Sequence, residues 1–547
     1  MKLTLNREFG EEKVVMTRLV DVIAIIGLVL VPWFQTRAEV QGMFPESILL
    51  VADFSTNRTA RANVDVPVRI DMSDADGLAF DVVVEDLSQF SEFTCYLKSG
   101  NGWYNLRFAP EHEGVSERVF LRKKGAGKED SPVGWDSISM IRISGWRSGT
   151  KDTTVRVSGF AKVLEAEIAE AEKGLDRTPR PCPMPDDGEF RAFWCHSAKG
   201  LGEGYDWDSS IRYLKRHGYN AIIANLSWPC VAFYRSRVLP ESKTLPTGGD
   251  RLEQCLKACR KHGVQCHVWK VCWNMGWAED CTQFAAEMKA AGRTQVRTDS
   301  QDGAKWLCPS HPLNRQMEID AMVELAGKGI DGIHFDYIRY PGDNGCYCDG
   351  CRARFEKRFG RPVARWPKDL KDDATTSRAW KAFRVENITA VVKAVSDRVR
   401  REHPKTAISA AVFQNPESTP DTLAQDWLSW CKRGYLDFIC PMNYVDSAAL
   451  QKASARMQLN AVKGTGVKVY PGIGLSVFRK DGCDARRLSE QIAVLRELGA
   501  PGFTVFNFDK RAQGALPKIL TATERADCGN GNVSNASHCE LKRQMDM

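Results

Sequence analysis

The chain has 547 residues, of which 43% are hydrophobic and 27% are charged. It is too apolar to be a disordered protein and too long for one small domain, so we expect two globular units. The formal net charge of +7 comes from Lys and Arg spread over the whole length, with no dense basic run interleaved with aromatic residues. The sequence therefore argues against nucleic acid as a partner.

Residues 1–38 have the layout of a secretory signal. Arg18 precedes an apolar stretch from Leu19 to Phe34, and Thr36 and Ala38 follow as the small residues that a cleavage site requires. The alternative is an uncleaved anchor, but about 16 apolar residues are fewer than the roughly 20 that cross a bilayer. We expect a secreted or periplasmic protein, in contact with the membrane only if this segment is retained.

Residues 46–164 alternate short β-rich runs with turn residues, which predicts an antiparallel β-sandwich. The closing run, "GWDSISMIRISGWRSGTKDTTVRVSGFAKV", resembles the galactose-binding-like jelly rolls that accompany many glycoside hydrolases. The resemblance implies a carbohydrate-binding domain. Aromatic residues that could stack on sugar rings, or that could instead belong to the core, are Trp103, Tyr104, Trp135 and Trp146.

Residues 165–188 form a linker, with a short charged helix first and a proline-rich stretch after it. From 189 to 520 the pattern changes to apolar strands that alternate with amphipathic helices. The predicted strands are 190–196, 220–228, 264–273, 332–338, 407–413, 438–444, 467–475 and 502–508. Eight such strands predict an α/β fold, a (β/α)8 TIM barrel that follows the sandwich. Residues 521–547 form a polar tail.

In such barrels the active site lies where the strands end. The strand ends carry aromatic rings, amides and a few charges, a lining that suits a sugar. The residues predicted to bind substrate are Trp194, His196, Asn225, His267, Trp269, Lys270, Asn274, His334, Tyr337, Arg339, Asn443, Tyr444, Asn507 and Asp509. A phosphate site would need clustered Lys and Arg residues or a loop of converging backbone N–H groups, and the strand ends show neither.

Three stretches resemble the glycosyl-hydrolase-like 10 group of (β/α)8 proteins. They are "IDGIHFDYIRYP", "HGVQCHVWKVCWN" and "AQDWLSWCKRGYLDFICPMNY", and the likeness covers roughly residues 190 to 510. The resemblance implies that Asp336 lies at the centre of a sugar site. It also implies that the residues around it are His267, Trp269, Asp426, Asn443 and Tyr444.

Asp336 is the first candidate catalytic carboxylate, and the alternative is that it braces a loop with Arg339. In chitinase-like barrels the fourth strand ends on a glutamic acid, but here that register holds Ile338, which excludes their mechanism. Glycoside hydrolysis commonly needs two carboxyl groups. The candidates for the second are Asp426, which could equally be a helix N-cap, Glu417 and Asp509.

The loop after the fourth strand contains Cys346, Cys348 and Cys351 in the sequence "CYCDGC". This spacing resembles the zinc cluster of family 42 β-galactosidases, where a fourth cysteine lies upstream, and Cys308 could take that position. Four thiolates would close the shell, so such a zinc would be structural and catalysis would need no cofactor. The alternative is a disulfide between two of the three cysteines.

The sequence thus predicts an exported glycoside hydrolase that acts on a polysaccharide or oligosaccharide. Two alternatives remain open, a sugar-binding barrel without chemistry and a transglycosylase that uses the same carboxylates. The sugar, the stereochemical outcome and the oligomeric state are left open.

Overall fold

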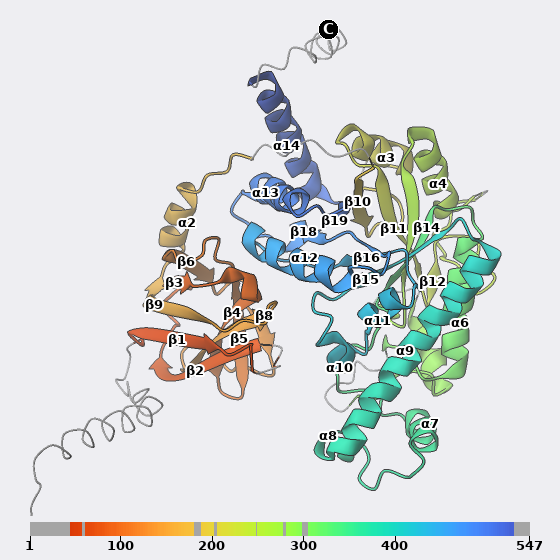
Figure 1. Cartoon of the computed structure of the whole chain (residues 1–547), viewed down its shortest axis with the longest axis horizontal. Helices are drawn as coiled ribbons and strands as arrows, with labels where there is room; N and C mark the ends of the chain where they lie inside the picture. Colours follow the sequence, from red (N-terminus) through yellow and green to blue (C-terminus); the bar gives the residue numbers. More distant parts are fainter. Residues whose placement is uncertain are drawn as a thin grey trace, which may run out of the picture.

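The structure, a computed structural model, describes residues 44–529 except 57–58, 60, 180–187, 202–204, 248, 277–280 and 298–304. The predicted signal at 1–38 lies outside the described residues, as do most of the proline-rich linker and the end of the polar tail. Figure 1 shows the two units that the sequence predicts, a β-sandwich followed by a barrel-like sheet with helices around it. In the described part of the chain, no helix combines the length and the apolar character needed to span a bilayer.

The N-terminal unit consists of two antiparallel sheets (Figure 1). The four-stranded sheet has the order β1 (Ser47–Ala52), β9 (Thr153–Val163), β3 (Gly77–Val84) and β6 (Glu117–Arg122). The five-stranded sheet has the order β2 (Arg61–Ile70), β8 (Ile138–Arg147), β4 (Phe90–Ser99), β5 (Gly102–Phe108) and β7 (Gly127–Glu129). Buried and exposed residues alternate strictly along β1, because successive side chains of a strand point to opposite faces.

The second unit is built on a parallel sheet whose strands follow the predicted positions. They are β10 (Phe190–Cys195), β11 (Ala221–Trp228), β13 (Gln265–Val271), β14 (Gly332–Asp336), β15 (Ala407–Val412), β16 (Phe438–Pro441), β17 (Lys468–Val469), β18 (Gly472–Gly474) and β19 (Gly502–Phe506). From β10 to β17 each strand in this list pairs with the next, and β19 pairs with both β10 and β18. The two ends of this path, β17 and β18, are two parts of the predicted strand 467–475, so the sheet curls round in a TIM-like form. A short strand β12 (Val231–Ala232) pairs antiparallel with β11.

Helices between the strands cover the outside of this sheet (Figure 1). They are α3 (Trp207–Arg216), α4 (Arg251–His262), α5 (Thr282–Ala290), α6 (Pro312–Ala326), α7 (Asp349–Phe359), α8 (Asp369–Asp372), α9 (Ala374–Glu402), α10 (Thr419–Leu423), α11 (Trp427–Lys432), α12 (Ala448–Val462), α13 (Asp484–Glu497) and α14 (Lys510–Gly529). Helix α2 (Glu165–Lys173) is the predicted short helix of the linker. Helix α14 continues into the segment predicted as a polar tail.

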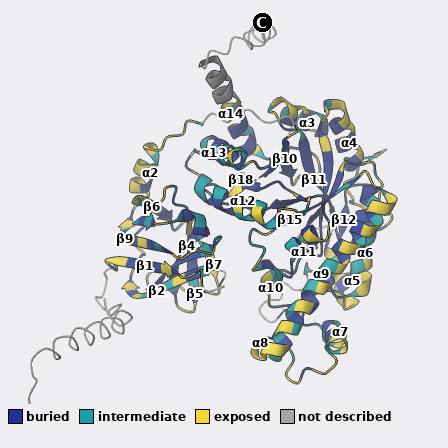
Figure 2. Ribbon diagram, viewed as in Figure 1, coloured by how far each residue is buried: buried dark blue, intermediate teal, exposed yellow. Residues whose placement is uncertain are grey.

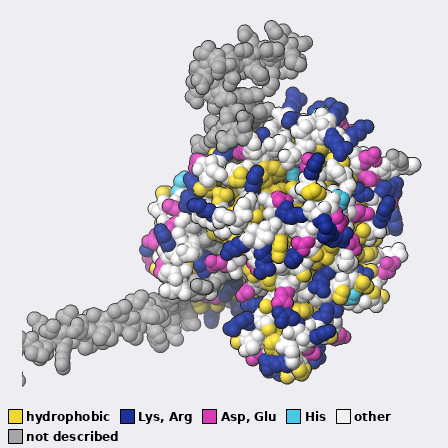
Figure 3. Space-filling view, turned by 45° about the vertical axis from the view of Figure 1, so that its right-hand side comes forward, with side chains coloured by type: hydrophobic (Ala, Val, Ile, Leu, Met, Phe, Trp, Pro, Cys, Tyr) yellow, Lys and Arg dark blue, Asp and Glu magenta, His cyan; other side chains and the backbone are white. Residues whose placement is uncertain are grey.

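The strands of the barrel are buried on both sides, whereas the helices are buried on one side only (Figure 2). In α4 the buried residues include Leu252, Cys255 and Cys259, which recur at helical spacing. Gly263 ends this helix in the left-handed conformation with φ 63°, which glycine adopts without steric strain. On the face shown in Figure 3, Lys and Arg side chains are interspersed with Asp and Glu.

Most cysteines contribute to the core as free thiols. One disulfide joins Cys230 to Cys281, and the other cysteines that the structure describes are free and almost all buried. Buried free cysteine packs as a small apolar side chain. In the described part of the chain, the cysteines therefore serve mainly as core residues and not as disulfide partners.

Candidate functional site

A cleft with a volume of about 640 Å³ lies at the carboxyl ends of the barrel strands. The barrel residues at its centre are Trp194, His196, Trp269, Asp336, Tyr337, Arg339, Tyr444 and Phe506. A second group follows β15, with Phe413, Gln414, Asn415, Ser418, Thr419, Thr422 and Leu423. The sandwich contributes Ser91, Glu92, Arg107, Trp146 and Arg147. The cleft therefore lies between the two units and draws side chains from both.

Asp336 is the last residue of β14 and only 8% of it is exposed to solvent. Its Oδ1 accepts a hydrogen bond from the backbone N–H of Tyr337 at 2.6 Å. Burial raises the pKa of Asp336 to about 6, although the Tyr337 N–H, the Arg339 charge and Trp269 act in the opposite direction. A carboxyl group with this pKa exists in both protonation states near neutral pH, as proton transfer requires.

The backbone turns sharply directly after Asp336. Tyr337 has a φ of 54°, a left-handed conformation that is unusual for a tyrosine. The turn leaves Tyr337 and Arg339 on the rim of the cleft. The Arg339 guanidinium lies 4.8 Å from the ring centre of Tyr337 and 4.9 Å from that of Phe413. Strained residues of this kind often hold functional groups in position.

Aromatic rings surround Asp336. Tyr444 stacks on Phe506 with ring centres 5.2 Å apart, and His196 lies 4.6 Å from Trp269. Seven residues named from the sequence line the cleft: Trp194, His196, Trp269, Asp336, Tyr337, Arg339 and Tyr444. Rings of this kind offer stacking surfaces for the apolar faces of a pyranose.

Two predicted histidines lie inside the barrel and do not line the cleft. His334 is fully buried, and its pKa is lowered to about 3 by burial and by the charge of His267. His267 is also buried and packs between Phe190 and Phe438, with ring centres 5.5 Å away in each case. Both rings fill the interior, so the prediction that they bind substrate is not supported by their positions.

Lys270 was expected in the site, but the alternation of β13 points it away from the barrel axis. It is fully buried, and its Nζ forms an ion pair with Glu318 of α6. Glu318 also accepts the backbone N–H of Trp273 at 3.0 Å. The prediction for Lys270 is wrong, because Trp269 and Val271 occupy the inward positions on either side of it.

None of the three carboxylates predicted as partners of Asp336 lines the cleft. Asp426 is the N-cap of α11 and accepts the N–H of Ser429 at 3.3 Å. Asp509 accepts the N–H groups of Arg511 and Ala512 at the start of α14. The side chain of Glu417 is 65% exposed, and its Oε2 lies 3.5 Å from Arg147 Nη2. Local helix capping explains the first two.

The four predicted amides also form internal contacts outside the cleft. Asn225 accepts the indole N–H of Trp228 at 2.6 Å, and Asn274 accepts the N–H of Gly276 at 2.8 Å. Asn443 exchanges two hydrogen bonds with Gln458, at 2.9 and 2.7 Å. Asn507 accepts the backbone N–H of His196 at 3.4 Å. These amides support the strand ends that carry the lining residues.

Several lining residues were missed from the sequence. Phe506 directly precedes the predicted Asn507, and strand alternation could have identified it as inward-facing. Phe413 and Asn415 lie in the loop after β15, where barrels commonly carry functional groups. Of the five residues from the sandwich, Trp146 is among the aromatic residues that the sequence offered for stacking on a sugar. The other four carry no sequence signal, because their position depends on how the two units dock.

The four cysteines predicted as a metal site come together. The sulfur atoms of Cys308, Cys346, Cys348 and Cys351 all lie within 4.8 Å of one another. The Cys308 sulfur is 3.3 Å from that of Cys351 and 3.9 Å from that of Cys348. Tetrahedral zinc with Zn–S bonds of about 2.3 Å separates its sulfur ligands by about 3.8 Å, so the four residues fit a structural zinc. A second group of three buried cysteines contains Cys255, Cys259 and Cys266.

A family model described as glycosyl hydrolase-like 10 matches residues 190–480. No curated protein matches the chain.

Solved structures with a similar course of the chain include the PgaB (BpsB) glycoside hydrolase domain from Bordetella bronchiseptica. The two sequences are 13% identical, the match covers 61% of this chain and 99% of the Bordetella domain, and the TM-score is 0.47. Alpha-L-fucosidase isoenzyme 2 from Paenibacillus thiaminolyticus is 15% identical over 63% of this chain and 50% of its own, with a TM-score of 0.44. A beta-galactosidase from Bacillus circulans sp. alkalophilus is 16% identical over 58% of this chain and 50% of its own, with a TM-score of 0.40.

Proposed function

The chain belongs to the glycosyl hydrolase-like 10 family, and we propose that its cleft hydrolyses O-glycosidic bonds in a polysaccharide or oligosaccharide. One observation carries the proposal: Asp336, a buried carboxyl group with a pKa of about 6, lies at a strand end among aromatic rings. Glycoside hydrolysis needs an acid of this kind to protonate the leaving oxygen.

In this proposal Asp336 acts as the general acid. Its protonated form donates to the glycosidic oxygen, and the carboxylate that remains accepts the Tyr337 N–H at 2.6 Å. Trp269, Tyr444 and Phe506 stack against the apolar faces of the sugar and hold the glycosidic oxygen beside Asp336. The C–O bond to the protonated oxygen breaks, the leaving sugar departs as an alcohol, and water supplies the hydroxyl group that the anomeric carbon gains. Arg339 stabilises the carboxylate form by its charge.

The cleft contains one other lining carboxylate in the part of the chain that the structure describes, Glu92 of the sandwich. Glu92 is already engaged in an ion pair with Arg107, whose Nε lies 3.0 Å from its Oε1. This favours, as the second candidate function, a barrel that binds a glycan without cleaving it.

We also propose that the protein is exported. The signal-like layout of residues 1–38 supports this, as does the Cys230–Cys281 disulfide, since disulfides persist in oxidising compartments. The four-cysteine group is proposed to hold one structural zinc, because four thiolates leave no open position for a substrate or water.

A glycan screen tests the function. The full chain is incubated with soluble polysaccharides and aryl glycosides, and released reducing ends are measured for the wild type and for Asp336→Asn. We expect release by the wild type alone, with an unchanged melting temperature for the variant. Asp421→Asn is the control, because this carboxylate is exposed and pairs with Lys381 at 2.8 Å. Binding of a glycan with no reducing ends released over days would establish the second candidate instead.

A further inference from the structure

The five-stranded sheet of the sandwich forms one wall of the cleft that contains Asp336. The wall consists of Ser91 and Glu92 on β4, Arg107 on β5, and Trp146 and Arg147 on β8. A carbohydrate-binding domain that acted independently would place its site away from the barrel. Here the sheet faces the same cavity as the barrel residues, so the two units share one site.

Three of these side chains form a contiguous patch on the outer face of the sheet. Glu92 lies opposite Trp146 in the β4–β8 register, and Phe93, the next residue, points into the sandwich core. Arg107 reaches Glu92 from β5, with Nε 3.0 Å from Oε1. We call Glu92, Arg107 and Trp146 the sandwich patch.

Trp146 is suited to hold a ring. The guanidinium of Arg61 lies 4.9 Å from the centre of its ring, so one contact of the indole is already fixed. The residue itself lines the cleft, whereas its Nε1 is buried. The face of an indole that lines a cleft can stack on the apolar face of a pyranose.

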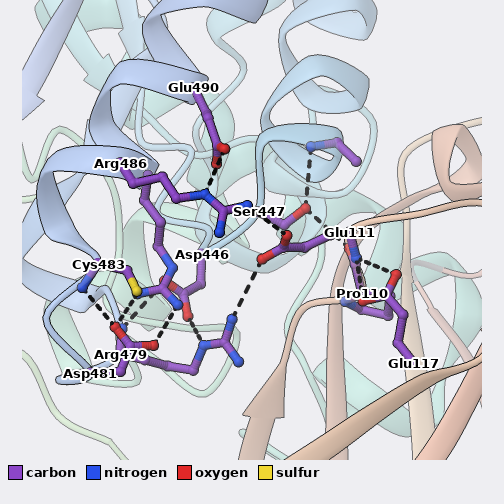
Figure 4. Close-up of polar contacts among 12 residues, drawn as sticks. Pro110, Glu111, Glu117, Asp446, Ser447, Arg479, Asp481, Cys483, Arg486 and Glu490 are labelled. Atoms are coloured by element: carbon purple, nitrogen blue, oxygen red, sulfur yellow. Dashed lines mark hydrogen bonds and ion pairs between the residues drawn. The ribbon is translucent and has the colours of Figure 1, made fainter. Parts of the chain in front are cut away.

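The sandwich patch is held in place by contacts between the units. Ser447 at the start of α12 donates to the carbonyl of Pro110 at 3.1 Å, and Arg479 and Arg486 approach Glu111 at 3.9 and 3.7 Å (Figure 4). Val445 and Leu450 of the barrel unit belong to the hydrophobic core of the sandwich. Beside the cleft, Asn415 donates to the carbonyl of Arg147 at 3.2 Å. A wall anchored in this way is preorganised for a ligand.

The charges of this wall favour a neutral ligand. Arg107 is paired with Glu92, and Arg147 lies 3.5 Å from Glu417. Guanidinium groups that already face carboxylates offer hydrogen bonds but little net positive charge. Hydroxyl groups, which both donate and accept, match such pairs better than a carboxylate or sulfate does.

We propose that the sandwich patch is a distal subsite of the cleft and binds a neutral sugar unit of the chain whose glycosidic bond is held at Asp336. This inference rests on the proposed function and adds a requirement to it. Substrates long enough to reach from the barrel to the sandwich gain this extra contact, so the protein prefers oligomers or polymers to single glycosides.

The test compares Trp146→Ala and Glu92→Gln with Trp103→Ala in the full chain. Trp103 is an aromatic residue of the same sheet that lies outside the cleft lining. The probes are hexasaccharides of cellulose, chitin, xylan and agarose, with the corresponding p-nitrophenyl monoglycosides. For any hexasaccharide that is cut, we expect KM to rise about tenfold in both cleft variants, which corresponds to about 1.4 kcal/mol. Cleavage of any monoglycoside should stay within about twofold of the wild type in both variants, since a single sugar unit at Asp336 does not reach the distal subsite.

Calorimetric titration of Asp336→Asn with the same hexasaccharides separates this inference from the proposed function. Suppose that the wild type cuts no substrate but a hexasaccharide binds. If Trp146→Ala then abolishes this binding and Trp103→Ala keeps it, the subsite is supported and hydrolysis is rejected. Equal KM and equal affinity in the cleft variants and the control would overturn the subsite and leave hydrolysis intact. The subsite would also be overturned if no hexasaccharide bound. It would be overturned as well if hexagalacturonate bound more tightly than the neutral hexasaccharides and Arg107→Gln removed that preference. Melting temperatures verify folding, and Glu92→Gln, which is nearly isosteric, covers the case in which Trp146→Ala does not fold.

Discussion

Trp194 donates its indole N–H to Nε2 of His334 at 3.1 Å across the interior of the barrel. The histidine must accept there, so its proton lies on Nδ1 and is donated to Ser409 Oγ, 2.9 Å away. Burial keeps the pKa of His334 at about 3, so the ring stays neutral in the working range of pH. This chain of hydrogen bonds fixes the orientation of Trp194 in the floor of the cleft.

Replacement of His334 should therefore affect binding and leave the pH dependence of the reaction unchanged. His334→Phe leaves a buried donor on Trp194 without a partner, which costs about 1–3 kcal/mol of stability and raises KM. His334→Gln should recover part of the stability and reverse part of the increase in KM, because the side-chain carbonyl of glutamine can accept the indole N–H of Trp194. Steady-state kinetics over a range of pH checks this, and a pH profile that moved in His334→Gln would contradict it.

The protonation of Asp336 sets the pH dependence of hydrolysis. Because burial raises its pKa to about 6, the protonated acid predominates below that pH and is lost above it. We expect kcat/KM to fall as the pH rises through about 6, by roughly tenfold for each further unit. Arg339→Met should move this fall to higher pH, since the Arg339 charge lowers the pKa of Asp336. A kcat/KM that instead rose through pH 6 would make Asp336 a nucleophile or base.

Asp426 should matter for stability alone. Its carboxylate caps α11 through the N–H of Ser429, and Asp426→Ala should lower the free energy of unfolding by about 0.5–2 kcal/mol. Activity per folded molecule should remain that of the wild type. Urea denaturation and kinetics on the same preparation measure both. A hundredfold loss of kcat without loss of stability would return Asp426 to the list of catalytic candidates.

The buried pair of Lys270 and Glu318 should show strong coupling. Lys270→Met leaves the Glu318 charge buried without a partner, which costs about 3–5 kcal/mol. Adding Glu318→Gln removes that charge and keeps an acceptor for the Trp273 N–H, so most of the loss should be recovered. Lys381→Met breaks a partly exposed pair and should cost at most about 1 kcal/mol. Additive losses in the double variant, measured by denaturation, would contradict this account.

Metal analysis tests the four-cysteine group. Protein purified without added metal should contain about one zinc per chain, and Cys348→Ser should lose it together with thermal stability. Cys483→Ser, a buried thiol outside both cysteine groups, is the matched control and should keep the metal. Zinc below about one-tenth of an atom per chain in the wild type would exclude the site. More than one zinc per chain would indicate a second site at Cys255, Cys259 and Cys266.

The strands could be predicted because their signal is local. Apolar runs such as 220–228 and 438–444 recur at the spacing of a βα-barrel, and glycine ends helices such as α4 where the sequence places it. The inward position of Trp269 and Asp336 follows from the alternation of side chains along a strand. The gathering of Cys308 with Cys346, Cys348 and Cys351 was also predicted, from a spacing that resembles a known zinc cluster.

By itself the sequence determined the two units, the order of the strands and the residues at their ends, because periodicity and turn chemistry are properties of short segments. Only the tertiary structure decided which polar strand-end residues face the cleft. Lys270 pairs with Glu318, a residue that is close to it only in the folded structure. Asp426 instead caps the helix that begins directly after it. The docking of the sandwich, which brings Glu92 and Trp146 to the same cleft as Asp336, depends on contacts between residues more than 300 positions apart, such as Pro110 and Ser447. Contacts of that kind arise from the packing of whole units, and no local pattern records them.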